Sequence, residues 1–181
     1  MEEYNLNSVI PFRKVNEAYG AFSNMSREYP INCNGNFFIT SEHLYIALRF
    51  SGHDDIQKQI QEHKNAMFCK KCFVNAKKYS EYRVQNWDEI CIDVMKYVLK
   101  LKYEQNPEFV KLLESTVDKY IVEDTTFHKG ERSFFWGCKN VGDKYVGYNN
   151  LGKILMELRD NKGVIDYNIK HDLYLFGEKI K

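Results

Sequence analysis

A carboxylate followed by a histidine opens the first helical pattern of the sequence. Glu42 and His43 stand in "TSEHLYIALRF", where apolar residues recur at helical spacing. This spacing predicts a helix over residues 42–50, with Ser41 as its N-cap. An acidic residue in a first helical turn more often stabilises the helix dipole than performs catalysis. The same dipole keeps the carboxylate charged, which suits a group that stabilises positive charge or positions water.

Other polar and aromatic residues stand at the edges of apolar segments, and each also has an ordinary structural explanation. Trp87 begins a periodic stretch that predicts a helix over residues 87–103, where a tryptophan usually anchors the core. Asn149 precedes the periodic "LGKILMELRDN" and could cap that helix. Glu123 lies near the end of "KYIVED", a short run over residues 119–124 that predicts a strand, and could be a solvated charge. Chemistry requires such residues to converge in space, which spacing does not establish.

In their order along the chain, these segments resemble the NADAR superfamily, which includes bacterial N-glycosidases that act on riboflavin intermediates. The resemblance covers roughly residues 8–160 and rests on "FSN", "TSEHLYIALRF", "RVQNW", "LKYEQNP", "LLEST", "IVED", "FFWG" and "GYNNLGKILMELR". It implies an α+β fold, mostly helical, in a single compact domain over residues 1–181 with small β pieces near the termini. Residues 161–181 would form a C-terminal extension.

The resemblance also implies an activity, which is the hydrolysis of an N-glycosidic bond to ribose in a nucleotide-like substrate. Substrates of the family are phosphorylated riboflavin-pathway intermediates, and some relatives remove ADP-ribose from guanine bases. The residues that it implies for catalysis are Glu42, Glu123 and Asn149. The residues that it implies for substrate binding are Phe22, Ser23, Asn24, His43, Arg49, Arg83, Trp87, Lys102, Trp136, Gly137 and Gly147.

These residue types fit the chemistry of N-glycoside cleavage. The transition state resembles an oxocarbenium ion, so a carboxylate such as Glu42 near the anomeric carbon stabilises the developing charge or activates water. Trp87 and Trp136 can stack the base, and Asn24 and Asn149 can bind ribose hydroxyls or base edges. Cationic side chains can receive phosphate, and those implied here are Arg49, Arg83 and Lys102.

Two positions depart from the family pattern. The family usually has Lys where Arg49 stands, and Asp where this chain has Ser133. If that Asp assists catalysis in relatives, this chain is slower, uses Glu123, Asp124 or Glu131 instead, or only binds its ligand. The alternative is therefore a binding module for NAD- or ADP-ribose-type ligands with little catalysis. A helical interaction domain with all its aromatic residues in the core is a third possibility.

The composition narrows the classes of protein that fit. With 26 basic and 25 acidic residues, the chain has no bulk electrostatic attraction to nucleic acid or membranes, although a local basic patch can be hidden in that sum. Cys69 and Cys72 form a C-x-x-C without the second pair that a zinc site needs, so we expect no metal and no cofactor. The irregularly spaced cysteines and the acidic, polar start predict a cytoplasmic protein without a signal peptide. No apolar run reaches the ~20 residues of a membrane span.

Further elements follow from local signals. Asn34-Gly35 predicts a hairpin turn, and residues 54–79 predict two helices. "NPEFVKLLEST" predicts a helix with Pro107 in its first turn. Residues 125–150 read as a long loop, and the tail after it could add a small hairpin. We expect a small-molecule substrate or an ADP-ribosylated nucleobase, either free or within nucleic acid, and make no prediction of the oligomeric state.

Overall fold

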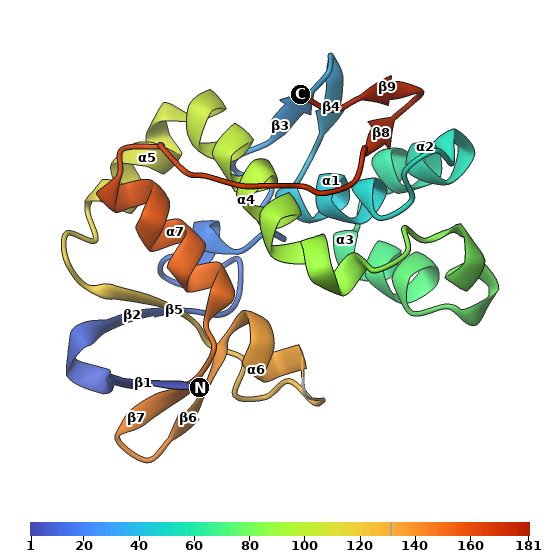
Figure 1. Cartoon of the computed structure of the whole chain (residues 1–181). Coiled ribbons are helices and arrows are strands. Elements are labelled where there is room, and N and C mark those ends of the chain that lie inside the picture. Colours follow the sequence, from blue (N-terminus) through green and yellow to red (C-terminus); the bar gives the residue numbers. More distant parts are fainter. Residues whose placement is uncertain (131) are drawn as a thin grey trace. The chain divides into compact units, whose positions relative to one another are not determined.

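A computed structural model of the chain describes residues 1–130 and 132–181 (Figure 1). The chain packs as two compact units, each formed from two separate stretches. Unit 1 comprises Met1–Ser26 and Asn106–Ile165, and unit 2 comprises Arg27–Gln105 and Asp166–Lys181. Helices predominate over short strands in this architecture, which confirms the predicted α+β class.

Unit 1 holds most of the strand structure. Its elements in chain order are β1 (Glu2–Asn5), η1 (Leu6–Ser8), β2 (Val9–Phe12), η2 (Gly20–Phe22), α5 (Pro107–Glu114), β5 (Tyr120–Glu123), α6 (Arg132–Trp136), β6 (Cys138–Val141), β7 (Lys144–Gly147) and α7 (Asn150–Asp160). Strands β1, β7 and β6 form an antiparallel sheet with β7 in the middle. Strand β5 pairs in parallel with β2, which places Phe12 opposite Glu123.

Helix α7 supports the strands of unit 1. Its apolar side, which includes Leu151, Ile154 and Leu155, is buried, and the helix packs on β5. Pro107 occupies the first turn of α5, as predicted, where its missing N–H costs no hydrogen bond. Figure 1 shows α7 beside the chain that forms β5.

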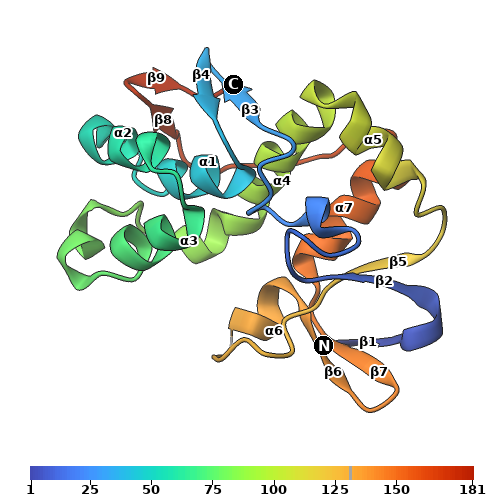
Figure 2. The same cartoon turned by 180° about the vertical axis from the view of Figure 1, so that it is seen from behind.

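Unit 2 is mainly helical and is seen from behind in Figure 2. Its elements in chain order are β3 (Ile31–Cys33), β4 (Asn36–Phe38), α1 (Ser41–Leu48), α2 (Asp54–Glu62), α3 (Ala66–Cys69), the π-helical turn η3 (Lys70–Val74), the 3-10 helix η4 (Lys77–Tyr82), α4 (Trp87–Gln105), β8 (Tyr174–Leu175) and β9 (Glu178–Lys179). Every residue of α1 is buried, because the helix packs against α2 and α4. The functional candidates on α1 are therefore held by a fixed core element.

The predicted hairpin turn at Asn34-Gly35 is confirmed. Both residues have positive φ, 50° for Asn34 and 78° for Gly35, and they join β3 to β4. Asn and Gly tolerate this left-handed backbone better than other residues do, which is why the pair marks such turns. The predicted tail hairpin is also present, as β8 and β9.

Two local predictions differ from the structure. Thr40, and not Ser41, is the N-cap of α1, and its Oγ1 accepts a hydrogen bond from the backbone N–H of His43 at 3.2 Å. Residues 125–150 are not one long loop, since they contain α6, β6 and β7. The pairing of β7 with β1 stabilises this region, and that partner lies at the other end of the unit's sequence. No helix among the described residues is both long and apolar enough to cross a membrane.

Candidate active site

The first turn of α1 gathers polar groups in the interior of unit 2. Glu42 is 6% exposed, and its Oε1 lies 3.7 Å from Nζ of Lys70, the first residue of η3. This ammonium and the positive end of the helix both stabilise the negative charge of the carboxylate. Ser41 and His43 flank Glu42 and are exposed by 1% and 0%. The carboxylate is thus buried, lies beside an ammonium group and is fixed by helix packing.

His43 presents a hydrogen-bonding atom without a protein partner. Thr40 Oγ1 accepts from the backbone N–H of His43 and lies 2.8 Å from its Nδ1. When the hydroxyl of Thr40 donates to Nδ1, the proton of the neutral ring is on Nε2. Within residues 1–130 and 132–181, neither Nε2 of His43 nor Oγ of Ser41 has a hydrogen-bond partner, although both atoms are buried. Burial also lowers the pKa of His43, so the ring is neutral.

Trp87 lies between a tyrosine and an arginine. Its indole Nε1–H donates to Oη of Tyr45 at 3.2 Å, and the two rings meet edge to face. Burial raises the pKa of Tyr45, so its hydroxyl stays protonated. The guanidinium carbon of Arg49 lies 5.4 Å from the centre of the Trp87 ring. Trp87 is 3% exposed, so in unit 2 it anchors Tyr45 and Arg49, and its predicted stacking on a base stays a prediction.

Lys102 is a fully buried amine on α4. Burial lowers its pKa to about 7, although Glu28 acts in the opposite direction. Its Nζ lies 5.7 Å from the centre of the Tyr29 ring. An amine in this state is charged in only part of the molecules near neutral pH, and a phosphate brought to it would favour the charged form.

Arg83 supports the chain within unit 2. Its Nη2 donates to the carbonyl of Phe73 at 3.2 Å and to that of Ala76 at 2.6 Å. These bonds hold η3 and the start of η4 together. Because these bonds use part of its hydrogen-bond donors, Arg83 has fewer donors left for a phosphate, and its predicted role in substrate binding stays a prediction.

In unit 1, Asn149 binds the backbone of β5. Its Oδ1 accepts from the N–H of Glu123 at 3.2 Å, and its Nδ2 donates to the carbonyl of Ile121 at 2.8 Å. Asn149 is fully buried with φ of 52°, and its side chain does not cap α7. It therefore positions the residue that carries the Glu123 carboxylate.

Glycines make this arrangement possible. A Cβ on Gly152 would lie 2.1 Å from the carbonyl oxygen of Ile121 and 2.5 Å from the amide of Asn149. A Cβ on Gly137 would lie 2.4 Å from the carbonyl oxygen of Glu123, and one on Gly147 would lie 2.2 Å from that of Gly137. Gly137 and Gly147 thus serve close backbone packing around Glu123.

Ser133 and Asp124 are both engaged in local structure. Ser133 is 6% exposed, and its Oγ donates to the carbonyl of Gly130 at 2.6 Å. Asp124 Oδ1 accepts from the N–H and the hydroxyl of Thr126. Asp124 Oδ2 accepts from the hydroxyl of Tyr145 at 3.3 Å. Glu131, the other proposed substitute for the missing Asp, lies outside the described residues.

The remaining candidates of unit 1 differ in exposure. Phe22 is fully buried and packs edge to face with Phe12, so it belongs to the core. Ser23 Oγ accepts from the N–H of Met25 at 3.2 Å, and Asn24 is 6% exposed. Trp136, at the end of α6, is partly buried and meets the Phe135 ring edge to face, so its predicted stacking on a base stays a prediction.

A family comparison decides the identity of this arrangement. The NADAR domain matches residues 11–161. This chain belongs to the NADAR family. That range takes in most of unit 1 and nearly all of the helical part of unit 2.

Relatives of this NADAR chain include proteins named as glycosidases. N-glycosidase YbiA of Shigella flexneri is 31% identical over 158 residues, which cover 87% of this chain and 91% of the relative. A riboflavin biosynthesis protein of Vibrio vulnificus is 31% identical over 153 residues, which cover 83% of this chain and 38% of the relative. The NMR structure of Escherichia coli YbiA has a TM-score of 0.70 at 28% identity and covers 91% of this chain and 92% of its own.

Within each unit, the NADAR fold brings some predicted residues together. In unit 2, α1 carries Glu42 and His43, and Arg49 meets Trp87. In unit 1, Asn149 meets Glu123. Sequence reasoning missed three groups that complete the unit 2 arrangement, namely Thr40, Tyr45 and Lys70. Thr40 could have been found, because threonine before a helical pattern is a common N-cap. Lys70 lies within "CKKC", which was interpreted only through its cysteines.

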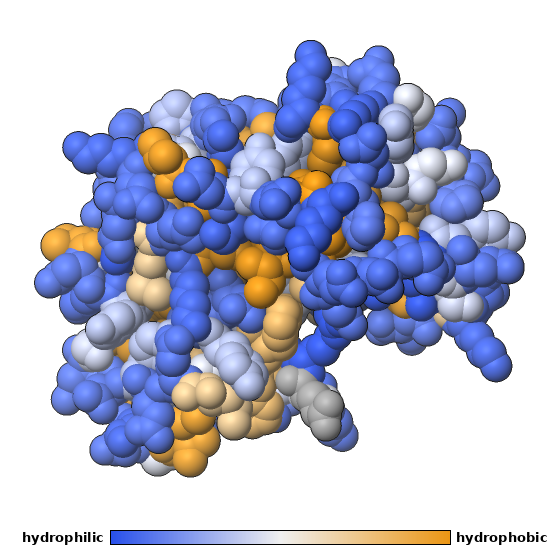
Figure 3. Space-filling view, viewed as in Figure 1, coloured by the Kyte–Doolittle hydropathy of each residue, from blue (hydrophilic) through white to orange (hydrophobic). Residues whose placement is uncertain are grey.

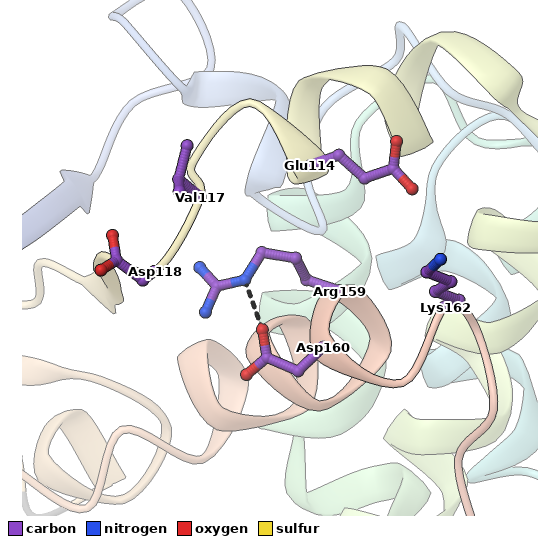
Figure 4. A pocket seen from close by; sticks show the side chains of 6 residues that line it. All are labelled: Glu114, Val117, Asp118, Arg159, Asp160 and Lys162. Atoms are coloured by element: carbon purple, nitrogen blue, oxygen red, sulfur yellow. Dashed lines mark hydrogen bonds and ion pairs between the residues drawn. The ribbon is translucent and has the colours of Figure 1, made fainter.

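Unit 1 also has a surface pocket that is lined by other residues than the predicted site residues (Figure 4). It lies at the ends of α5 and α7 and is lined by Glu114, Val117, Asp118, Arg159, Asp160 and Lys162. Arg159 is already bound there, because it donates to Thr116 Oγ1 at 2.9 Å, to the Lys119 carbonyl at 2.7 Å and to Asp160 at 2.7 Å. None of the NADAR candidates lines this pocket, so we do not assign the activity to it.

Proposed function

We propose that this protein is an N-glycosidase that hydrolyses the bond between ribose and a base in a nucleotide-like substrate. The observation that carries the proposal is the first turn of α1, where the buried carboxylate of Glu42 stands between Ser41 and His43. Both neighbours keep a buried polar atom that has no partner among the described residues. Buried polar atoms without partners are rare in proteins and are explained here by a polar ligand or water.

Glu42 has the properties of the residue that stabilises the transition state. When the bond between C1′ of the ribose and the base nitrogen breaks, its electron pair leaves with the base and positive charge develops on the sugar. A fixed carboxylate stabilises that charge at little cost in reorganisation. Water then adds to C1′ and gives its proton to the Glu42 carboxylate. Glu42 passes this proton on to solvent, and the base nitrogen takes up one proton from solvent, so the carboxylate is regenerated. The products are the free base and the ribose portion, which now carries a hydroxyl on C1′.

The neutral state of His43 suits a donor of hydrogen bonds. With its proton on Nε2, the ring can hold a ribose hydroxyl or the water molecule beside Glu42. The hydroxyl of Ser41 can act in the same way and can either donate or accept. We therefore assign positioning of sugar or water to these two residues and charge stabilisation to Glu42.

The choice of substrate is supported by the relatives and by the cations. Several relatives bear the name N-glycosidase, and others are named riboflavin biosynthesis proteins. Arg49 and Lys102 in unit 2 are the side chains that we assign to phosphate. A phosphorylated ribosylaminopyrimidine and an ADP-ribosylated guanine both contain the ribose–base bond that the proposal requires.

A direct assay tests the activity. The protein is incubated separately with a phosphorylated ribosylaminopyrimidine and with ADP-ribosylated guanosine, and free base is measured by chromatography. The proposal expects release of base from at least one of them above the rate without protein. Tight binding of both without release would favour the alternative, a ligand-binding module with little catalysis, for which the exchange of the family Asp for Ser133 provides the reason.

A further inference from the structure

Positive charge is concentrated in residues 64–83 of unit 2, which we call the basic segment. It carries five lysines and one arginine against one acidic residue, Glu81, whereas the whole chain has 26 basic and 25 acidic residues. The lysines are all exposed, and they are Lys64, Lys70, Lys71, Lys77 and Lys78. The rest of the chain is therefore net acidic, so a polyanion would be attracted to the basic segment and repelled elsewhere.

Most of these charges are not neutralised by the protein. Lys70 lies 3.7 Å from the carboxylate of Glu42. Over residues 1–130 and 132–181, Lys64, Lys71 and Lys77 have no carboxylate within ion-pair distance. The Nζ of Lys78 lies 4.6 Å from the centre of the Tyr79 ring, which leaves its charge unpaired as well. When such lysines neutralise phosphates, the counterions condensed on a nucleic acid are released, which favours binding.

Apolar and aromatic side chains are exposed on the same segment. Met67, Phe68 and Tyr82 have 58%, 48% and 38% of their surface exposed. The Phe68 ring is nearly parallel to that of His63, with an angle of 6° and 4.4 Å between the ring centres. Exposed flat rings among lysines are the features with which proteins bind single-stranded nucleic acids, because bases stack on the rings while cations follow the backbone.

The basic segment is made of helical turns that pack on one another, unlike an extended tail. Helix α3, η3 and η4 follow one another in Figure 1 (green), and η3 contacts both α3 and η4. Arg83 closes the segment through its bonds to Phe73 and Ala76. Figure 3 shows that hydrophilic residues (blue) cover most of the surface over this part of the unit in that view.

We propose that the basic segment binds the backbone of single-stranded nucleic acid. Lys70 joins the segment to Glu42, so a strand bound along the lysines would run to the residue that we assign to catalysis. This link rests on the proposed function. The binding itself does not depend on catalysis. An anionic membrane is the competing partner, and the parallel pairing of Phe68 with His63 favours stacking over insertion into lipid.

Fluorescence anisotropy with an unmodified, labelled 16-nucleotide single strand, as DNA and as RNA, tests the surface. The variant Lys71→Glu/Lys77→Glu/Lys78→Glu leaves Lys70 in place, because Lys70 touches Glu42. We expect at least a tenfold loss of affinity at low salt and a salt dependence that is lower by about 2 in the log–log slope. The corresponding Lys→Gln variant repeats the test without added acidic groups in case the first variant does not fold.

A charge-matched control separates this surface from bulk electrostatics. Its three exposed lysines lie outside the segment, and they are Lys58, Lys111 and Lys170. We expect reversal of these charges to weaken binding less than threefold. Absence of binding by the wild-type protein, an equal loss in both variants, or stronger binding to phosphatidylserine vesicles than to either strand would overturn the proposal. Release of base from a small N-riboside phosphate should be unchanged in the segment variant, so the surface and the activity can fail independently.

Discussion

Asn149 binds β5 on both sides of Val122, because its amide accepts from the N–H of Glu123 and donates to the carbonyl of Ile121. The side chain is fully buried, so these bonds are shielded from water. Two backbone groups of one strand thus depend on one side chain of the segment that leads into α7. The arrangement makes Asn149 a positioning residue for Glu123 in the NADAR fold.

Asn149→Ala should destabilise unit 1. It leaves a buried N–H and a buried carbonyl without partners, which costs about 2–4 kcal/mol in the free energy of unfolding. Urea denaturation measures this loss, with Asn168→Ala, an exposed residue of the tail, as the control. A loss below about 0.5 kcal/mol, as is usual for surface substitutions, would contradict the role of the amide.

Gly152→Ala tests the close approach of α7 to β5. Helix propensity alone predicts that alanine stabilises α7 by about 1 kcal/mol. The new Cβ would stand 2.1 Å from the Ile121 carbonyl oxygen, so we expect the opposite sign and a loss of about 1–3 kcal/mol. The sign of the change in unfolding free energy therefore decides between the two effects, and a more stable variant would show that the contact relaxes freely.

Lys102→Met should make stability depend less on pH. The pKa of Lys102 is about 7 in the folded chain and 10.5 in the unfolded chain, so unfolding takes up a proton between these values. The stability of the wild-type protein should rise with pH across that window, since the cost of burying this lysine is full below pH 7 and absent above pH 10.5.

The test compares the unfolding free energies of the wild-type protein and the Lys102→Met variant as a function of pH. The methionine variant lacks the titrating group, so its advantage in unfolding free energy should be largest near pH 6 and should shrink toward pH 10 by up to a few kcal/mol. Lys100→Met, on the same helix but partly exposed, is the control and should show no such trend. A difference that stays constant with pH would mean that Lys102 keeps its ordinary pKa.

Ser133→Asp introduces the residue that the family usually carries. The hydroxyl of Ser133 donates to the carbonyl of Gly130 at 2.6 Å, whereas a carboxylate there can only accept and would be repelled. We expect a loss of about 1–3 kcal/mol in the free energy of unfolding and no gain in base release. A faster enzyme of unchanged stability would show that this chain had only lost a catalytic acid.

The sequence predicted those elements that depend on residues close together in the chain. The apolar periodicity after Trp87 predicted α4, and the Asn34-Gly35 pair predicted its hairpin turn. The β6–β7 hairpin was missed, because its stability depends on pairing with β1, for example of Tyr145 with Tyr4, and no local pattern records that partner.

The candidate site was predictable to a similar degree. Glu42 and Trp87 were predicted to stand at helix starts, and the structure places them in the first turns of α1 and α4. Lys70 was not predicted as a site residue, since its proximity to Glu42 arises from the packing of α3, which continues into η3, on α1. For Asn149 the sequence offered a catalytic role or a cap of α7. The hydrogen bonds of its side chain to β5 could not be predicted from a local pattern.

The role of Glu42 is tested most directly by Glu42→Gln, which keeps the shape of the side chain and removes its charge. Release of base from the N-riboside substrate is measured together with ligand binding, and Glu89→Gln, an exposed first-turn acid of α4, is the matched control. We predict that kcat/KM falls by roughly 10²–10⁴-fold for Glu42→Gln, with binding retained, and stays within about twofold for the control. Unchanged turnover by a folded Glu42→Gln protein that binds its substrate would contradict the account.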